Sequence, residues 1–192
     1  MALGAAWIGI NFWPGSPRRV ELARAREVVD AVAGRAATVG IFVDQEPAFV
    51  AETRDALALD LVQLHGDEIP ETVARFGSRA LRAVGVDDGF RPDALAAFPD
   101  VWGFLFDVRD PVRYGGTGRS WPYERVRGLD PGKPWLLAGG IRPDTVREVL
   151  ARSGARAIDV CSGVEASPGV KDSAAMRRLF EEVHDGATAR LA

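Results

Sequence analysis

Polar residues stand directly after several apolar runs of this sequence, where they could do acid–base or binding chemistry. Asp107 follows residues 101–106, Val-Trp-Gly-Phe-Leu-Phe, so its carboxyl group borders an apolar wall. Partial removal from water raises the pKa of a carboxyl group and suits it to act as a general acid. An alternative interpretation is that Asp107 caps the turn after it. The sequence leaves both open.

Two other side chains near the ends of such runs can bind a substrate. Arg18 follows Ser16 and Pro17, and a planar guanidinium can hold a carboxylate through two hydrogen bonds. The alternative is a solvated surface arginine, which is the interpretation we favour for Arg19. His65 ends the run 61–64 and can serve as a base, a hydrogen-bond donor or a structural histidine.

Small residues follow the last two apolar runs, as Gly139-Gly140 and Ser162-Gly163. In barrels of parallel strands the loops after the last two strands often bind a phosphate through backbone N–H groups. The segment 164–172 leads into the last predicted helix and could place the N-terminus of that helix at the same phosphate. The alternative is that these glycines only permit tight turns.

Short apolar runs rich in β-branched and aromatic residues alternate with segments of helical periodicity, and together they must position these side chains. Prolines at positions 47, 70, 92 and 143 fit the first turn of a helix. The predicted strands are Ala6–Trp13, Thr38–Val43, Leu61–His65, Ala80–Val86, Val101–Asp107, Pro134–Ala138 and Ala157–Cys161. The predicted helical segments are Leu22–Ala33, Pro47–Leu57, Pro70–Phe76, Pro92–Phe98, Tyr123–Val126, Pro143–Arg152 and Ser173–Val183.

This alternation predicts an α/β fold with a parallel sheet covered by helices. No Gly-x-Gly-x-x-Gly follows the first run, so a closed (βα)8 TIM barrel is favoured over a dinucleotide-binding sheet. A complete barrel has eight strands, whereas we predict seven. We therefore expect one barrel domain over residues 1–192, with the first strand and most of the first helix missing from this chain.

Composition excludes several classes of protein. The 192 residues carry 24 basic and 27 acidic side chains, a formal net charge of −3, so no strong field is available for nucleic acid or an anionic membrane. Cys161 is the only cysteine, and there are two histidines, which excludes a disulfide within the chain and a thiolate-rich or histidine-rich metal site. Residues 1–10 are too short an apolar stretch to span a bilayer. We expect a cytoplasmic protein with no nucleic-acid or membrane partner.

Six motifs occur in an order and spacing that closely resemble the phosphoribosylanthranilate isomerase family, from Gly4 to about Phe180. The two C-terminal motifs look like that family's phosphate loops. The motifs are GINFWPGSPR (9–18), VGIFV (39–43), VQLHGDE (62–68), GGTG (115–118), LAGGIRP (137–143) and IDVCSGVE (158–165), the last continuing through SPGVKD (167–172).

The resemblance implies a single (βα)8 barrel that acts without a cofactor or metal. It would convert N-(5-phosphoribosyl)anthranilate to 1-(2-carboxyphenylamino)-1-deoxyribulose 5-phosphate by an Amadori rearrangement in tryptophan biosynthesis. Asp107 would be the general acid, Arg18 would hold the anthranilate carboxylate, and His65 would also bind the substrate. Gly139, Gly140, Ser162 and Gly163 would bind the phosphate. The partner would be this small-molecule substrate, and the protein would be a monomer or a homodimer.

One part of the family pattern is absent. The family's general base is a cysteine in a Lys-x-Cys-Gly-x-Thr motif on the first strand, and this sequence has no such motif. Either the cellular protein is longer, or the chain is a catalytically impaired phosphosugar-binding protein. Cys161 could replace the base or be a small packing residue beside the phosphate loop. A phosphosugar isomerase of histidine biosynthesis is disfavoured, because its substrates carry two phosphates and one phosphate site is evident.

Overall fold

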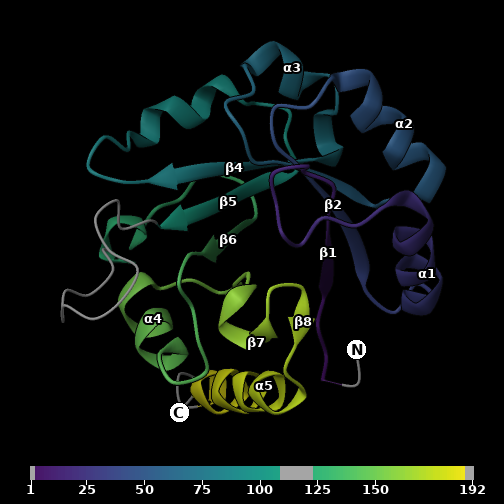
Figure 1. Ribbon diagram of the computed structural model, residues 1–192. Coiled ribbons are helices and arrows are strands. Elements are labelled where there is room, and N and C mark those ends of the chain that lie inside the picture. Colours follow the sequence, from purple (N-terminus) through teal and green to yellow (C-terminus); the bar gives the residue numbers. More distant parts are fainter. Residues whose placement is uncertain (1–2, 109–122, 189–192) are drawn as a thin grey trace. The chain divides into compact units, whose positions relative to one another are not determined.

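The computed structural model describes residues 3–108 and 123–188 of the chain (Figure 1). These residues group into two compact units, of which unit 1 contains residues 1–83 and 95–104, and unit 2 contains residues 84–94 and 105–192. Strands β4 (Ala80–Val86) and β5 (Gly103–Val108) contribute to both units. The expectation of a single domain over residues 1–192 stays a prediction.

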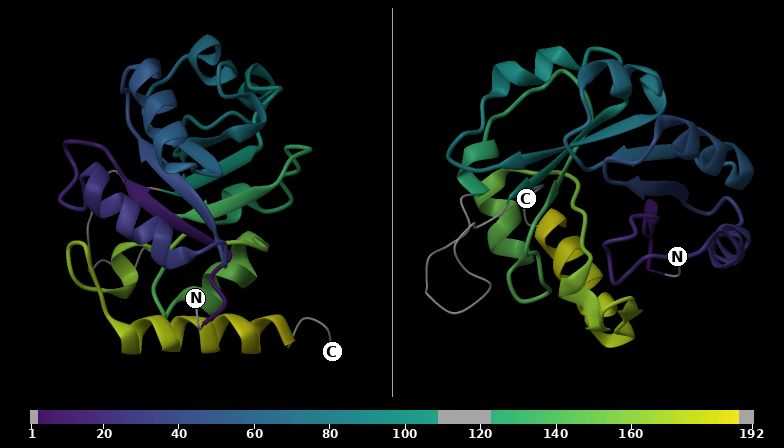
Figure 2. Two further views of the ribbon diagram at one scale, coloured as in Figure 1. Left: turned by 90° about the vertical axis from the view of Figure 1, so that its right-hand side faces the viewer. Right: turned by 45° about the horizontal axis from the view of Figure 1, so that its top comes forward.

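Unit 1 is built from parallel strands joined by helices, as the alternation of patterns predicts. Strands β1 (Trp7–Asn11), β2 (Ala37–Phe42), β3 (Leu61–Leu64) and β4 are hydrogen-bonded in that order, and each neighbouring pair is parallel. Parallel neighbours need crossover connections, which helices α1 (Leu22–Val32), α2 (Pro47–Leu57) and α3 (Pro70–Ala74) provide, with the 3₁₀ helix η1 (Gly77–Arg79) before β4. Helices α1 and α2 pack side by side (Figures 1 and 2).

Burial in unit 1 follows the sequence pattern. All four residues of β3 are buried, as expected for a strand covered on both faces. The side chain of Leu59 fills the space beside Gly40 in β2. A Cβ at position 40 would lie 2.7 Å from Leu59 Cδ1, so any larger residue would require a neighbouring side chain to shift. Pro47 and Pro70 occupy the first turns of α2 and α3, as predicted. The largest fully buried side chains of this unit include Phe42, Leu57, Leu59, Leu64 and Phe104.

Helices α1 and α2 both end on an alanine with left-handed backbone, Ala33 at φ 50° and Ala58 at φ 51°. This conformation costs ~1–2 kcal/mol for a residue with a Cβ, and glycine avoids the cost at an entropic penalty of ~0.5–1 kcal/mol. We therefore expect Ala58→Gly to raise Tm by ~2 °C, as measured by circular dichroism. Ala51→Gly, inside α2, is the matched control and should lower Tm. A lower Tm for Ala58→Gly would contradict this account.

Unit 2 continues the strand order, which over the described residues is β1-β2-β3-β4-β5-β6. Strand β6 (Trp135–Ala138) precedes helix α4 (Val146–Ser153), and helix α5 (Ser173–Thr188) packs against α4. Two short strands, β7 (Glu165–Ser167) and β8 (Val170–Lys171), form a separate antiparallel sheet. Phe106 of β5 packs edge-on against Phe90 and Trp135, with ring centroids 5.8 and 5.5 Å apart. The remaining 3₁₀ helices are η2 (Pro92–Ala97, shared by both units), η3 (Tyr123–Val126) and η4 (Ser162–Val164).

The strand predicted over 157–161 is wrong. Those residues make a single parallel bridge, between Leu137 and Ile158, in which Leu137 N–H donates to Ala157 O and Asp159 N–H donates to Leu137 O. Extension stops because the backbone of Cys161 has ψ −84°, outside the β region, and turns into η4. The described residues therefore form a six-stranded main sheet rather than seven strands of an eight-stranded barrel.

Two smaller expectations also need correction, and one small sheet was not predicted. The helix predicted over 92–98 is the 3₁₀ helix η2. The helix predicted from Pro143 begins at Val146 instead, because residues 142–145 form a turn in which Arg142 N–H donates to the Thr145 hydroxyl. The sheet formed by β7 and β8 was not predicted. No helix in the described part of the chain is long and apolar enough to cross a bilayer.

Candidate functional site

In unit 1 the predicted site residues lie after the carboxyl ends of β1 and β3. Val20 N–H donates to Asn11 O (2.9 Å), which closes the loop after β1. Within this loop the Ser16 hydroxyl accepts a hydrogen bond from Arg18 N–H (3.1 Å). Arg18 is half-buried, whereas Arg19 is exposed and pairs with Glu21. The loop therefore places Arg18 after the carboxyl end of β1, and its role in binding a substrate carboxylate stays a prediction.

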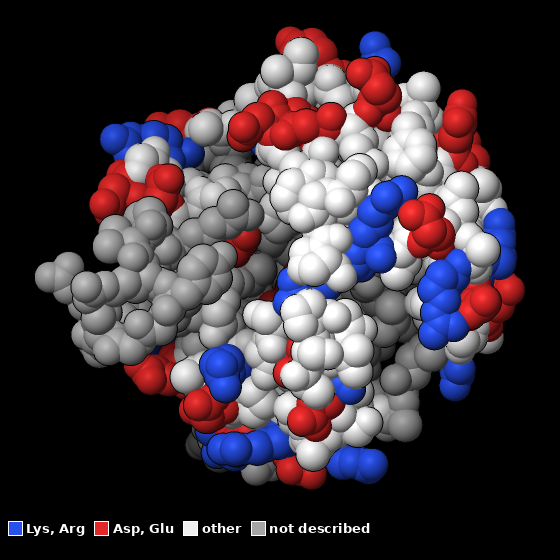
Figure 3. Space-filling model, viewed as in Figure 1, with Lys and Arg blue, Asp and Glu red and all other residues white. Residues whose placement is uncertain are grey.

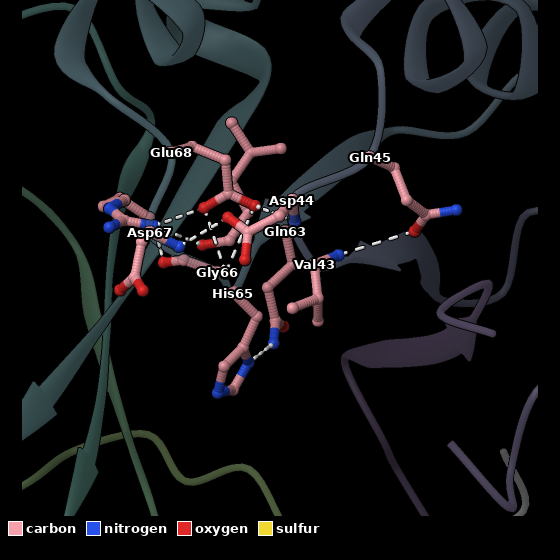
Figure 4. A network of polar contacts seen from close by, with 10 residues as sticks. Val43, Asp44, Gln45, Gln63, His65, Gly66, Asp67 and Glu68 are labelled. Atoms are coloured by element: carbon pink, nitrogen blue, oxygen red, sulfur yellow. Dashed lines mark hydrogen bonds and ion pairs between the residues drawn. The ribbon is translucent and has the colours of Figure 1, made fainter. Parts of the chain in front are cut away.

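His65 follows β3, and both its backbone and its ring make polar contacts, of which Figure 4 shows the one to Gln63. Its N–H donates to Phe42 O (2.9 Å), and its ring atom Nδ1 lies 2.6 Å from Nε2 of the buried Gln63. In this contact the amide nitrogen donates to Nδ1 in the tautomer that carries the ring proton on Nε2. In that tautomer Nε2 is the donor nitrogen, and a substrate-binding role for His65 stays a prediction.

A network of polar contacts surrounds the loop after β3 (Figure 4). The Glu68 carboxylate accepts hydrogen bonds from the backbone N–H groups of Asp44 and Gly66 and pairs with Arg82 on β4. Asp44 in turn accepts from Asp67 N–H through Oδ1 (2.6 Å). Sequence reasoning did not single out Glu68 or Arg82, although a charged residue inside the apolar run 80–86 was a visible signal.

In unit 2, Asp107 lies near the end of β5, after the buried residues Leu105 and Phe106, and is itself half-buried. The apolar surroundings expected for this carboxyl group stay a prediction. Its role as a general acid stays a prediction. The neighbouring Arg109 and the motif GGTG (115–118) lie outside the described residues.

The two predicted phosphate loops of unit 2 are in contact with each other. Gly139 (φ 101°) and Gly140 (φ 63°) adopt backbone conformations that favour glycine. A Cβ on Gly163 would lie 1.9 Å from Ile141 O, so the backbone of η4 packs directly on the loop after β6. This packing brings small residues of both loops together, as a site for a phosphate requires.

The sequence suggested that the N-terminus of α5 could join the phosphate site. In the structure, its first backbone N–H groups already donate to a side chain of the protein. Asp172 precedes the helix, and its Oδ1 accepts from Ala174 N–H (2.8 Å) and Ala175 N–H (3.0 Å). This carboxylate is an N-cap, and its negative charge disfavours an anion at the same helix end. The expectation for the N-terminus of α5 is therefore wrong.

Cys161 is exposed, which contradicts its interpretation as a packing residue. Lys171 Nζ donates to Cys161 O (2.9 Å), lies 3.8 Å from Cys161 Sγ and pairs with the buried Glu165 carboxylate (3.2 Å). Lys171 thus fastens β8 to the start of η4. Within residues 3–108 and 123–188, no group of three or more His, Cys, Asp or Glu residues is arranged to hold a metal ion.

Tyr123 supports the first phosphate loop, because its hydroxyl donates to Gly139 O (2.9 Å). Burial raises the pKa of Tyr123 to about 12; Glu148 adds to the rise and Arg152 opposes it. Between pH 10 and 12 the unfolded chain loses this proton while the folded protein keeps it, so the stability from this group is lost as pH rises through that window. We expect absorbance at 295 nm to show a tyrosine titrating near pH 12 that Tyr123→Phe removes. If that variant keeps the late titration, the assignment is wrong.

Comparisons with known proteins show which family this chain resembles. The family model described as N-(5'-phosphoribosyl)anthranilate isomerase matches residues 1–182. The isomerase of that name from Halorhodospira halophila is 39% identical over 185 residues, covering 96% of this chain and 88% of that relative. These coverages do not support the expectation that a first strand and most of a helix are missing, which stays a prediction.

Solved structures resemble the fold as well. The phosphoribosylanthranilate isomerase from Thermus thermophilus has a TM-score of 0.79 and 34% identity, covering 96% of this chain and 90% of that chain. Another such isomerase, solved in complex with reduced 1-(o-carboxyphenylamino)-1-deoxyribulose 5-phosphate, has a TM-score of 0.81 and 26% identity, with coverages of 96% and 90%. These neighbours are consistent with a TIM-barrel type of α/β fold.

Proposed function

The chain belongs to the N-(5'-phosphoribosyl)anthranilate isomerase family, and from this membership we propose that it performs the Amadori rearrangement of that substrate in tryptophan biosynthesis. The family match over residues 1–182 is the observation that carries the proposal. The positions of Asp107 near the end of β5 and of His65 after β3 support it, as do the glycines after β6 and in η4. The product would be 1-(2-carboxyphenylamino)-1-deoxyribulose 5-phosphate.

The reaction needs one acid and one base, and it needs no oxidant or reductant. Proton transfer from Asp107 to the ring oxygen opens the ribose ring and leaves an iminium at C1. A base then removes the proton on C2, giving an enolamine that tautomerises to the ketone. Asp107 is half-buried near the end of β5, and its carboxyl group would serve as the general acid of the first step.

Binding at both ends of the substrate would orient the sugar between these groups. The backbone N–H groups around Gly139, Gly140, Ser162 and Gly163 would hold the phosphate, and Arg18 would hold the anthranilate carboxylate. His65 would donate from Nε2 to a substrate oxygen. Fixing the reacting atoms in this way removes much of the entropic part of the barrier.

A second candidate function is phosphosugar binding without turnover. The observation that favours it is the cysteine content: the sequence has no Lys-x-Cys-Gly-x-Thr motif, and its only cysteine, Cys161, is exposed and held near Lys171 and Glu165. In this function the phosphate loops and Arg18 would still bind the ligand. Cys161→Ser separates the possibilities, since it should leave turnover unchanged unless Cys161 supplies the base.

The test is turnover by the 192-residue chain itself, followed by the loss of anthranilate fluorescence, alongside calorimetric titration with the reduced product analogue. Turnover supports the isomerase. Binding of the analogue without turnover supports the second candidate. If the chain shows no turnover and does not bind the analogue, both candidate functions are overturned.

The finer architecture belongs to the same proposal. We propose that the six ordered strands are part of a (βα)8 barrel whose first strand and most of whose first helix lie outside this chain. Adding a strand–helix unit with the Lys-x-Cys-Gly-x-Thr motif should then raise both Tm and turnover. No gain in either quantity would contradict it. We also propose a cytoplasmic monomer or homodimer, which sedimentation velocity and cell fractionation test.

A further inference from the structure

We propose that Arg82 is a positioning residue for this reaction, which acts by fixing the backbone on both sides of His65. The inference rests on the proposed function, in which His65 binds the substrate. Arg82 lies on β4 and touches the loop after β3, so its action on the substrate would pass through His65.

One nitrogen of Arg82 holds the loop at three points. Nη1 donates to Leu64 O (3.1 Å) and Gly66 O (2.9 Å), the carbonyl groups of the residues immediately before and after His65. The same nitrogen pairs with Glu68 Oε2 at 2.6 Å. A residue whose two neighbours are both anchored to a strand has little freedom to move its own backbone.

Glu68 and Asp44 hold the same loop from the side of β2, and together with Arg82 they form what we call the clamp around His65. The Glu68 carboxylate, of which only 4% is exposed, accepts from the N–H groups of Gly66 and Asp44. Asp44 has a left-handed backbone (φ 50°), which costs free energy for a residue with a Cβ. A Cβ on Gly66 would lie 2.2 Å from Asp44 Oδ1, so the two loops touch without space for a side chain. The loop around His65 is therefore joined to both neighbouring strands.

Burying the charged side chain of Arg82 costs folding free energy, so stabilising the sheet is a poor explanation for its presence. The side chain of Arg82 is 11% exposed, and its Nε is buried with no hydrogen-bond partner among the described residues. An unsatisfied buried donor is destabilising, and buried ion pairs often contribute less than apolar residues of similar volume. Phe98 packs 5.4 Å from the guanidinium carbon and offsets part of this cost. A charged residue at this place is better explained by the three oxygens that it orients.

The consequence reaches the imidazole of His65. The contact between Gln63 Nε2 and His65 Nδ1 is only 2.6 Å long and joins residues two positions apart on the clamped segment. A shift of the backbone at residues 64–66 would lengthen it and release the preference for the proton on Nε2. Arg82 thus acts on the imidazole through the backbone of residues 64–66, which keeps the ring beside Gln63.

The experiment compares Arg82→Gln with Arg79→Gln, a matched change at the last residue of η1, three positions before Arg82. Arg79 also donates to a backbone carbonyl, Leu59 O, but this acceptor precedes β3 and is not part of the loop around His65. Three quantities are measured for each purified full chain: KM and kcat, the Kd of the reduced product analogue, and the inhibition constant or Kd of inorganic phosphate. Long-range ¹H–¹⁵N spectra of the imidazoles report the tautomer, and only His65 and His184 contribute.

We expect Arg82→Gln to raise KM and the analogue Kd by ~10–100-fold, since a misplacement of about 1 Å has effects of that size. Phosphate binding should be unchanged, and the His65 signals should move from the Nε2–H pattern while those of His184 stay in place. Arg79→Gln should change none of these. Arg82→Lys should bind the analogue much more tightly than Arg82→Gln. A lysine also has one charged nitrogen, and a single nitrogen of Arg82 makes all three contacts.

A lower Tm for Arg82→Gln with wild-type KM, analogue Kd and imidazole signals would show a purely structural role and overturn the inference. If Arg82→Gln does not fold, Arg82→Lys and Glu68→Gln carry the same measurements, and wild-type values in both would also overturn it. Failure of the proposed function gives a different result, because a wild-type chain without turnover still reports analogue affinity and the His65 tautomer.

Discussion

Asp107→Asn is expected to lower kcat by ~10²–10⁴-fold, the range that a general acid contributes. The amide has nearly the shape of the protonated carboxyl group but does not transfer a proton to the ring oxygen. Asp107 is half-buried at the end of β5, so the substitution should cost little stability and leave KM and the analogue Kd nearly unchanged. Stopped-flow measurement of the anthranilate fluorescence gives kcat and KM separately.

The matched control for this prediction is Asp93→Asn, which makes the same chemical change at an exposed carboxylate on η2. It should leave both kinetic constants at their wild-type values. A kcat for Asp107→Asn within about threefold of wild type would exclude Asp107 as the general acid. The alternative in which Asp107 only caps a turn predicts a lower Tm with intact kcat.

Gly163→Ala is expected to have the largest effect on the phosphate site. Its added Cβ would lie 1.9 Å from Ile141 O and 3.0 Å from Ile141 C, and both neighbours are backbone atoms that cannot rotate away. The η4 segment and the loop after β6 must therefore move apart, at a cost of ~1–3 kcal/mol or more. Because the proposed phosphate N–H groups belong to these two loops, we expect the Kd for inorganic phosphate and for the analogue to rise at least tenfold, together with a lower Tm.

Gly85→Ala is the control for this change. Gly85 lies in β4, has an ordinary φ, and has no atom within 4 Å of the position of a new Cβ. It should leave Tm and both dissociation constants unchanged. Calorimetric titration and thermal unfolding measure the two effects independently. Unchanged phosphate affinity in Gly163→Ala despite a lower Tm would separate the packing of these loops from phosphate binding.

Local patterns were sufficient for most elements. Helix α2 begins and ends at the predicted residues, and β4 coincides with its prediction, because each is a run whose periodicity and flanking residues act over a few positions. Residues 157–161 look like a strand by composition, yet only Ile158 bridges to a neighbour. Pairing with Leu137 and the turn at Cys161 decide that outcome, and neither is visible in the segment itself.

The candidate site divides in the same way. The sequence by itself determined that Asp107 ends a buried run, that glycines follow β6 and occupy η4, and that the motifs occur in the order of the isomerase family. It determined these because burial and turn formation leave local signatures in residue type. The pairing of Arg82 with Glu68 across 14 positions, the occupation of the N-terminus of α5 by Asp172, and the exposure of Cys161 were decided only by the tertiary structure. Such contacts depend on which strands and loops become neighbours, and residue type constrains that choice only through the packing of the whole fold.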